Sequence, residues 1–291
     1  MKDFDYAVAA TIDEAVSLLA ARGEEAKVLT GGTDLIVQLR ENLRRAELVV
    51  DVKKIPELTR LQFTPSAGLS LGAAVPCYRI YEVAAIAAAY PALSDAARII
   101  GGWQIQSRAS VGGNLCNSSP AGDSIPTLMV HDATCHLAGP QGRRTVSATE
   151  FCTAPGRNIL LRGELLVSIE LPPPRPSASS AYQRFIPRNE MDIAAVGVGV
   201  WLQLSESGQT ISAARIALGA VAPTPVLAED ASRWLTGKPV TADTFAQAGE
   251  LAKQAARPIT DRRGTAEYRT HLVAVLVKRT LAKAVERAQA Q

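Results

Sequence analysis

The most informative stretch of this chain is Ser110-Val111-Gly112-Gly113-Asn114-Leu115-Cys116-Asn117-Ser118-Ser119-Pro120-Ala121-Gly122-Asp123. Two adjacent glycines are followed by short hydrogen-bonding side chains, and the stretch ends at a carboxylate. Glycine amides can contact a pyrophosphate without steric cover, while short polar side chains and an acceptor such as Asp123 suit sugar hydroxyls. Because the same residue types form ordinary turns, the stretch taken alone leaves both interpretations open.

A second pair of glycines occurs in Val28-Leu29-Thr30-Gly31-Gly32-Thr33-Asp34-Leu35. The pattern predicts a strand over 26–29 and a helix over 34–42, with the glycines between them. Such a loop can bind an anion, although an ordinary left-handed turn before a helix explains it equally well. Residues 101–126, which contain the first stretch, show almost no regular period and are expected to form a functional loop. Two glycine loops together favour an extended, phosphate-bearing ligand.

The remaining patterns predict an α/β beginning and an α+β end. A capping box at Thr11-Ile12-Asp13-Glu14 opens the first expected helix, which ends at Gly23. The proline-rich residues 172–177 are the clearest candidate for a domain boundary. Strands are expected at 48–52, 58–63, 69–74, 133–137, 164–171, 193–204 and 211–218, and helices at 78–89, 91–100, 225–235, 242–256 and 265–290.

Composition excludes several classes of function. The 291 residues are 47% hydrophobic and carry a formal net charge of only +3, which gives no reason to expect a nucleic acid partner. No signal peptide and no uninterrupted apolar span is evident, so we expect a cytoplasmic protein without a membrane span. The four cysteines form no Cys-x-x-Cys pair, and the sequence therefore predicts neither zinc nor an iron–sulfur cluster on this chain.

Two other features could indicate a hydrolase or a metal site, but their sequence context does not support either function. Gly68-Leu69-Ser70-Leu71-Gly72 fits the Gly-x-Ser-x-Gly pattern of hydrolases, but the flanking apolar residues predict that Ser70 lies within a strand and not at a sharp turn. The three histidines, His131, His136 and His271, lack metal-ligand spacing, so we expect no metal site.

The two glycine stretches resemble the flavin-binding motifs of the FAD subunits in the xanthine dehydrogenase and carbon monoxide dehydrogenase group of molybdenum hydroxylases. The second motif, a Gly-Gly-Asn-Leu-Cys-Asn run that ends at Pro-x-x-Asp, is long and specific. Further segments resemble the same family, and the likeness extends over essentially the whole chain. These segments are 163–169, 181–194 and 258–269.

The resemblance implies an α+β fold in two parts. A two-subdomain α/β FAD-binding domain of the PCMH, or vanillyl-alcohol-oxidase-like, type would occupy residues 1–175, with subdomains of about 1–55 and 56–175. A C-terminal α+β domain with a small antiparallel sheet and helices would occupy residues 176–291.

The resemblance also implies the cofactor-binding residues. Gly31, Gly32, Thr33 and Asp34 would surround the FAD pyrophosphate, Asp123 would accept from a sugar or ribityl hydroxyl, and Leu165 and Leu166 would lie near the ring system. Arg184 stands where the family usually has lysine, and a cation there could stabilise reduced flavin. The remaining members of the expected site are Val28, Leu29, Thr30, Leu35, Ile100, Gly101, Ser110, Gly112, Gly113, Asn114 and Asn117.

The function implied is electron transfer within an assembly, with no catalytic side chain and no metal ligand on this chain. A large subunit would carry the molybdenum cofactor, where electrons leave the substrate, and a small subunit would carry the [2Fe-2S] clusters that bring them to FAD. FAD would then pass them to NAD, a quinone, oxygen or another acceptor. A dimer of heterotrimers is expected. The alternatives are a stand-alone flavin-dependent oxidoreductase and a scaffold subunit without flavin.

Overall fold

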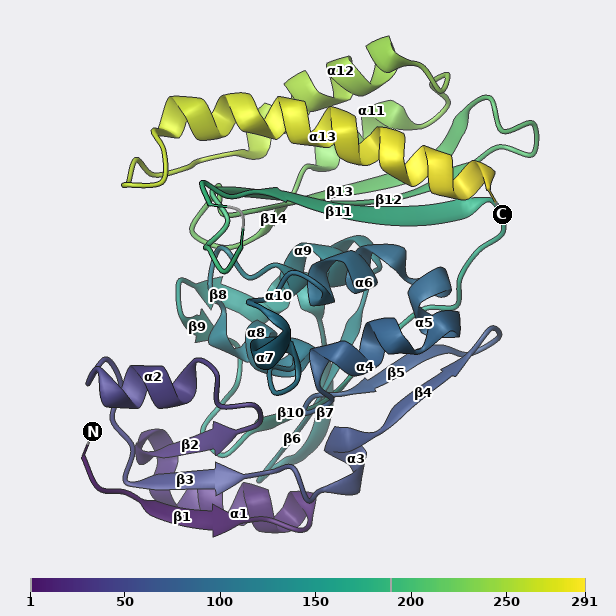
Figure 1. Cartoon of the computed structure of the whole chain (residues 1–291). Helices are drawn as coiled ribbons and strands as arrows, with labels where there is room; N and C mark the ends of the chain where they lie inside the picture. Colours follow the sequence, from purple (N-terminus) through teal and green to yellow (C-terminus); the bar gives the residue numbers. More distant parts are fainter. Residues whose placement is uncertain (1, 189, 291) are drawn as a thin grey trace.

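The computed structural model describes residues 2–188 and 190–290 (Figure 1). The N-terminal part contains a parallel sheet in the order β1-β3-β2, formed by Asp5–Val8, Leu48–Asp51 and Ala26–Leu29. Helix α1 (Ile12–Arg22) begins at Thr11, whose hydroxyl accepts a hydrogen bond from the Glu14 amide. A turn of 3-10 helix (Gly23–Glu25) leads into β2, and α2 (Leu35–Arg40) follows the first glycine loop.

The middle part of the chain is built on an antiparallel sheet in the order β4-β5-β10-β6-β7. Its strands are Leu61–Thr64, Gly68–Gly72, Leu165–Leu171, Thr134–Gly139 and Gly142–Ser147. Short helices and a small two-stranded sheet accompany it: α3 (Pro56–Thr59), α4 (Cys77–Glu82), α5 (Ala84–Ala89), α6 (Pro91–Ala97), α7 (Trp103–Gln106), α8 (Val111–Asn117), α9 (Ser124–Val130), α10 (Ala148–Phe151), β8 (Cys152–Ala154) and β9 (Arg157–Asn158).

The C-terminal part is an antiparallel sheet covered by helices. Its strands run in the order β11-β12-β13-β14, formed by Ala178–Phe185, Val196–Leu204, Ile211–Gly219 and Val226–Leu227. Helix α13 covers one face of this sheet, while α6 and α9 contact it from the opposite side (Figure 1). The helices of this part are α11 (Glu229–Leu235), α12 (Ala242–Ala252), a 3-10 turn (Lys253–Ala255) and α13 (Ala266–Gln289).

The two-part α+β architecture is confirmed, but the expectation that residues 101–126 form an irregular loop is wrong, although several of them line the cavity described below. This segment contains α7, α8 and the beginning of α9. Although glycine disfavours helix, α8 forms because the Ser110 hydroxyl accepts from the Gly113 amide and because Val111 and Leu115 are fully buried. Tertiary packing therefore compensates for poor local propensity.

Other predicted boundaries of helices and strands also differ from those in the structure. Leu58 lies in α3 and not in a strand, and the helix expected at 78–89 is divided at Val83 into α4 and α5. The strand expected at 193–204 begins at Val196, and the helix expected at 225–235 begins at Glu229, after β14. The sequence patterns gave no expectation of strands for β1, β7, β8, β9 and β11.

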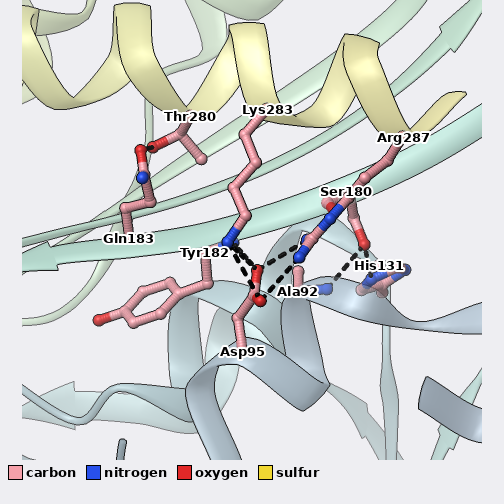
Figure 2. A network of polar contacts seen from close by, with 9 residues as sticks. All are labelled: Ala92, Asp95, His131, Ser180, Tyr182, Gln183, Thr280, Lys283 and Arg287. Atoms are coloured by element: carbon pink, nitrogen blue, oxygen red, sulfur yellow. Dashed lines mark hydrogen bonds and ion pairs between the residues drawn. The ribbon is translucent and has the colours of Figure 1, made fainter. Parts of the chain in front are cut away.

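The C-terminal sheet is fastened to the middle part by a network centred on Asp95 of α6 (Figure 2). Arg287 of α13 donates to both carboxylate oxygens, at 2.8 and 2.9 Å, and Lys283 lies 3.2 Å from each. The backbone amide of Tyr182 in β11 also donates to Asp95, at 3.0 Å. These contacts join α6, β11 and α13 at one point and so fix where β11 lies.

Candidate cofactor site

The sequence-predicted residues converge on one cavity of about 690 Å³. This volume lies within the range of cofactor pockets. The first glycine loop, α8, the start of β10 and the strand β11 all contribute to its wall. Of the expected residues, only Leu29 does not line the cavity, which is lined by Val28, Thr30, Gly31, Gly32, Thr33, Asp34, Leu35, Ile100, Gly101, Ser110, Gly112, Gly113, Asn114, Asn117, Asp123, Leu165, Leu166 and Arg184.

Two of the glycines are required by the packing of the protein against itself. A Cβ atom on Gly31 would lie 2.0 Å from the Arg108 carbonyl oxygen, and one on Gly112 would lie 2.4 Å from the Ala73 carbonyl oxygen. A Cβ on Gly113 would instead meet the side-chain oxygens of Thr30 and Ser110, at 2.9 and 3.0 Å. Gly31 thus lets the first glycine loop approach the backbone just before α8, and Gly112 lets α8 approach Ala73, which follows β5; the sequence did not reveal either reason.

The first glycine loop presents backbone donors that the protein does not use. Within the described chain, the amides of residues 31–35 donate no hydrogen bond, whereas the Ile36 amide donates to the Gly32 carbonyl. Gly32 has φ of +76°, a conformation that favours glycine. Consecutive free amides in a loop suit phosphate oxygens. The cavity wall therefore fits a phosphate-bearing cofactor.

The other end of the cavity contains a buried ion pair. The Asp123 carboxylate accepts from the Tyr182 hydroxyl at 2.8 Å and from the Arg184 guanidinium at 2.5 Å. The Asp123 and Arg184 side chains are 9% and 8% exposed. Burial raises the pKa of Asp123 to about 6, although the Arg184 charge and the Tyr182 hydrogen bond act against the rise. The same burial, together with Asp123, raises the pKa of Tyr182 well above its usual value.

Several cavity residues were not predicted from the sequence. Lys27 and Arg44 place cations in the wall near the first glycine loop. Gln38 donates to the Asn117 side chain at 3.0 Å and so connects α2 with α8. Asn158 donates to the Cys116 carbonyl at 2.8 Å. The only available signal was that Lys27 directly precedes the first glycine stretch, because the other contacts join segments far apart in sequence.

The residues of the other two motifs lie outside this cavity. Ser70 lies in the middle of β5, paired with Gln62 and Glu170, as its flanking residues predicted. His131 is buried with its ring 3.1 Å from the Ser180 hydroxyl, and burial lowers its pKa to about 3. Among residues 2–188 and 190–290, no group of three or more His, Cys, Asp or Glu side chains is arranged to hold a metal ion. Over the same residues, no helix is long and apolar enough to cross a membrane.

An α+β chain in which a glycine loop and a glycine-containing helix N-terminus line one large cavity has the features of a dinucleotide-binding protein. Residues 2–174 match the family described as the FAD binding domain in molybdopterin dehydrogenase, and residues 180–284 match the CO dehydrogenase flavoprotein C-terminal domain. The xanthine dehydrogenase FAD-binding subunit of Escherichia coli O157:H7 is 32% identical over 98% of this chain and 97% of its own length. The carbon monoxide dehydrogenase medium chain of Hydrogenophaga pseudoflava is 32% identical over 96% of each chain.

Solved structures agree. Reconstituted CO dehydrogenase from Oligotropha carboxidovorans matches with a TM-score of 0.93 and 31% identity, over 98% of this chain and 99% of that one. Quinoline 2-oxidoreductase from Pseudomonas putida 86 matches with a TM-score of 0.91 and 30% identity, over 99% of both chains. This chain belongs to the family of FAD-binding subunits of molybdenum hydroxylases.

Proposed function

We propose that this chain binds FAD in the cavity lined by its two glycine stretches and transfers electrons within a multi-subunit molybdenum hydroxylase. In this proposal, iron–sulfur clusters on a small partner subunit deliver the electrons, and a large partner subunit holds the molybdenum cofactor. The final acceptor is a small molecule or quinone. The observation that carries the proposal is that two glycine stretches 80 residues apart in sequence, joined by the 3.3 Å contact of Ser110 with Thr30, line the same cavity.

Different residues of the cavity would bind different parts of the cofactor. The free amides of residues 31–35 would bind the pyrophosphate, with Gly112 and Gly113 of α8 on the other side. Asp123 still has acceptor capacity for a hydroxyl, because each carboxylate oxygen receives only one of the hydrogen bonds from Tyr182 and Arg184. Ile100, Leu165 and Leu166 supply apolar wall. All nineteen residues expected from the sequence, Leu29 included, belong to this proposal.

FAD, when bound, supplies the capacity to take up electrons singly and to release them in pairs. The chain's own contribution is orientation and electrostatics. Tyr182 and Arg184 hold the Asp123 carboxylate in one position, so it can orient a hydroxyl without first losing side-chain freedom. The buried Arg184 places positive charge at this end of the cavity, where it favours any negative charge that develops on the bound group.

The domain limits, the assembly and the location are further parts of the proposal. Residues 1–175, with subdomains of about 1–55 and 56–175, would form the FAD-binding domain, and residues 176–291 the C-terminal domain. The chain would work in a dimer of heterotrimers in the cytoplasm. Light scattering of the complex purified through this chain would measure its mass, and metal analysis would show whether molybdenum and iron copurify.

The direct test is the absorption spectrum of the purified chain, followed by extraction and identification of any bound flavin. We expect one FAD per chain, with loss of most of it in Gly113→Leu. The matched control is Ala67→Leu, in an exposed turn outside the cavity, which should keep its flavin. Circular dichroism melts would establish that each variant is folded.

The opposite results are equally clear. A folded chain that stays colourless after incubation with FAD, alone and with its partner subunits, contradicts the proposal and favours the scaffold alternative. A yellow chain that oxidises an organic substrate without molybdenum or iron favours the stand-alone oxidoreductase.

A further inference from the structure

A second, smaller cavity lies at the junction between the middle part of the chain and the C-terminal sheet. Its volume is about 150 Å³, and a cavity of about this size can hold a benzene-sized ring. The wall is formed by the end of α9, the proline-rich segment 172–175 and the strands β11, β12 and β13. This junction cavity shares no lining residue with the cofactor cavity, so within the described chain it is a separate candidate site.

His131 presents a hydrogen-bond donor to this cavity that the protein does not use. The residue is 8% exposed, and its Nε2 atom lies 3.1 Å from the Ser180 hydroxyl (Figure 2). Ser180 is fully buried and already accepts from the Ala92 amide, so its own proton is donated to Nε2, its other partner among the described residues. Nε2 is therefore an acceptor, and the ring proton resides on Nδ1.

The His131 ring is neutral and its Nδ1–H is unpartnered. Burial and the Arg215 charge lower the pKa of His131 to about 3, so the ring carries a single proton at neutral pH. Among residues 2–188 and 190–290, the Nδ1 atom has no hydrogen-bond partner. Buried donors are normally satisfied, so this N–H points to an acceptor supplied by a ligand.

The charges that line the junction cavity leave an excess of one positive charge. Arg215 is paired with Asp132 at 3.0 Å. Arg175 lies over the Trp201 ring, 5.6 Å from its centroid, and forms no ion pair with any described residue. The unpaired guanidinium and the imidazole N–H therefore favour a ligand with a negatively charged acceptor group.

We propose that the junction cavity binds a small organic carboxylate, which accepts hydrogen bonds from Arg175 and from the Nδ1–H of His131. The apolar part of the ligand lies against Trp201 and the prolines of the segment 172–174. An inorganic oxyanion would leave this apolar wall without a partner, and a neutral ligand would leave the Arg175 charge uncompensated. The site is independent of flavin binding.

The test measures binding of benzoate to the full-length chain by isothermal titration calorimetry. Benzamide has nearly the same shape without the charge, and inorganic phosphate has the charge without an apolar part. We expect benzoate to bind at least about tenfold more tightly than either, and Arg175→Gln to weaken benzoate binding about tenfold. The matched control is Arg157→Gln, because Arg157 is also exposed and lies outside both cavities. Thermal melts would establish that both variants are folded.

Nitrogen-15 NMR of the histidine rings localises the ligand. Benzoate should shift the Nδ1 signal of His131, and the signals of His136 and His271, which do not line the junction cavity, should stay unchanged. The inference is overturned if neither benzoate nor the smaller butyrate binds wild type at concentrations up to about 10 mM. It is also overturned if benzamide or phosphate binds as tightly as benzoate, if Arg175→Gln binds benzoate like wild type, or if the His131 signal does not move.

Discussion

Replacing Asp95 with asparagine should destabilise the protein more than removing any exposed ion pair. The substitution keeps the shape and an acceptor for the Tyr182 amide but leaves Arg287 and Lys283 without their carboxylate. Removing one partner of a fully buried pair costs about 3–5 kcal/mol. The side chains of Asp95, Arg287 and Lys283 are 17%, 29% and 34% exposed, so solvent screens part of this cost and we expect a loss of about 2–3 kcal/mol.

The assay is urea denaturation of the wild-type chain and of Asp95→Asn at pH 7. The control is Asp132→Asn, because Asp132 also bridges the middle part to the C-terminal sheet, through Arg215 at 3.0 Å. That pair is 59% and 41% exposed, so its loss should cost less than about 1 kcal/mol. Equal losses in the two variants would refute the argument that burial makes the Asp95 network strong.

The same comparison has a defined pH dependence. The Arg287 hydrogen bonds lower the pKa of Asp95 in the folded state against the effect of burial. A carboxyl with a depressed folded pKa contributes stability that is fully present above its unfolded pKa and is lost as the pH falls through the folded value. The difference between wild type and Asp95→Asn should therefore be constant near neutral pH and shrink below about pH 4. A difference that grows on acidification would contradict this assignment.

Three further predictions concern the cavity and the core. In the flavin-free chain, the carboxyl of Asp123 should titrate at about pH 6 in carbon-13 NMR, and Arg184→Gln should raise that midpoint further because the opposing charge is gone. Gly31→Ala should lower the free energy of unfolding by more than about 3 kcal/mol, because the new Cβ atom would meet a backbone carbonyl. Gly113→Ala should lower it by less than about 2 kcal/mol, because its Cβ atom would meet only side chains; denaturant titration measures both values. Burial raises the pKa of the Cys77 thiol to about 12, and this side chain is fully buried, so Cys77 should react with a thiol reagent only after unfolding; rapid labelling of the native chain at this residue, detected by mass spectrometry, would contradict its placement.

The site residues that could be predicted from the sequence are those whose requirements come from neighbouring residues in the chain. The two glycine pairs, the short polar side chains beside them and Asp123 lie in two continuous stretches, and all but one of the residues expected at the site line the same cavity. Glycine at Gly32 is tied to a positive φ, and Ser110 acts as a helix cap within its own stretch. Such requirements are imposed by neighbours in the chain, so they leave a readable pattern.

What could not be predicted depends on contacts between distant segments. Helix α8 has a glycine-rich sequence that argues against helix, and it forms because its apolar side chains are buried by the rest of the fold. The requirement for glycine at Gly31 arises from the backbone of Arg108, which lies 77 positions away. The cations Lys27 and Arg44 come from separate elements, and their convergence on the cavity has no signature in spacing.

Tyr182 links the packing of the C-terminal sheet to the chemistry of the cavity. Its backbone amide donates to Asp95 at the junction, and its hydroxyl donates to Asp123 at the cavity. The two carboxyls have pKa shifts of opposite sign, because cations and hydrogen bonds outweigh burial at Asp95 whereas burial outweighs them at Asp123. As the pH falls from 7 towards 5, Asp123 therefore takes up its proton while Asp95 keeps its charge. Mild acid should change the electrostatics around Arg184 while β11 stays fastened, so effects of pH on cofactor binding in this range arise at the cavity and not from loss of the junction.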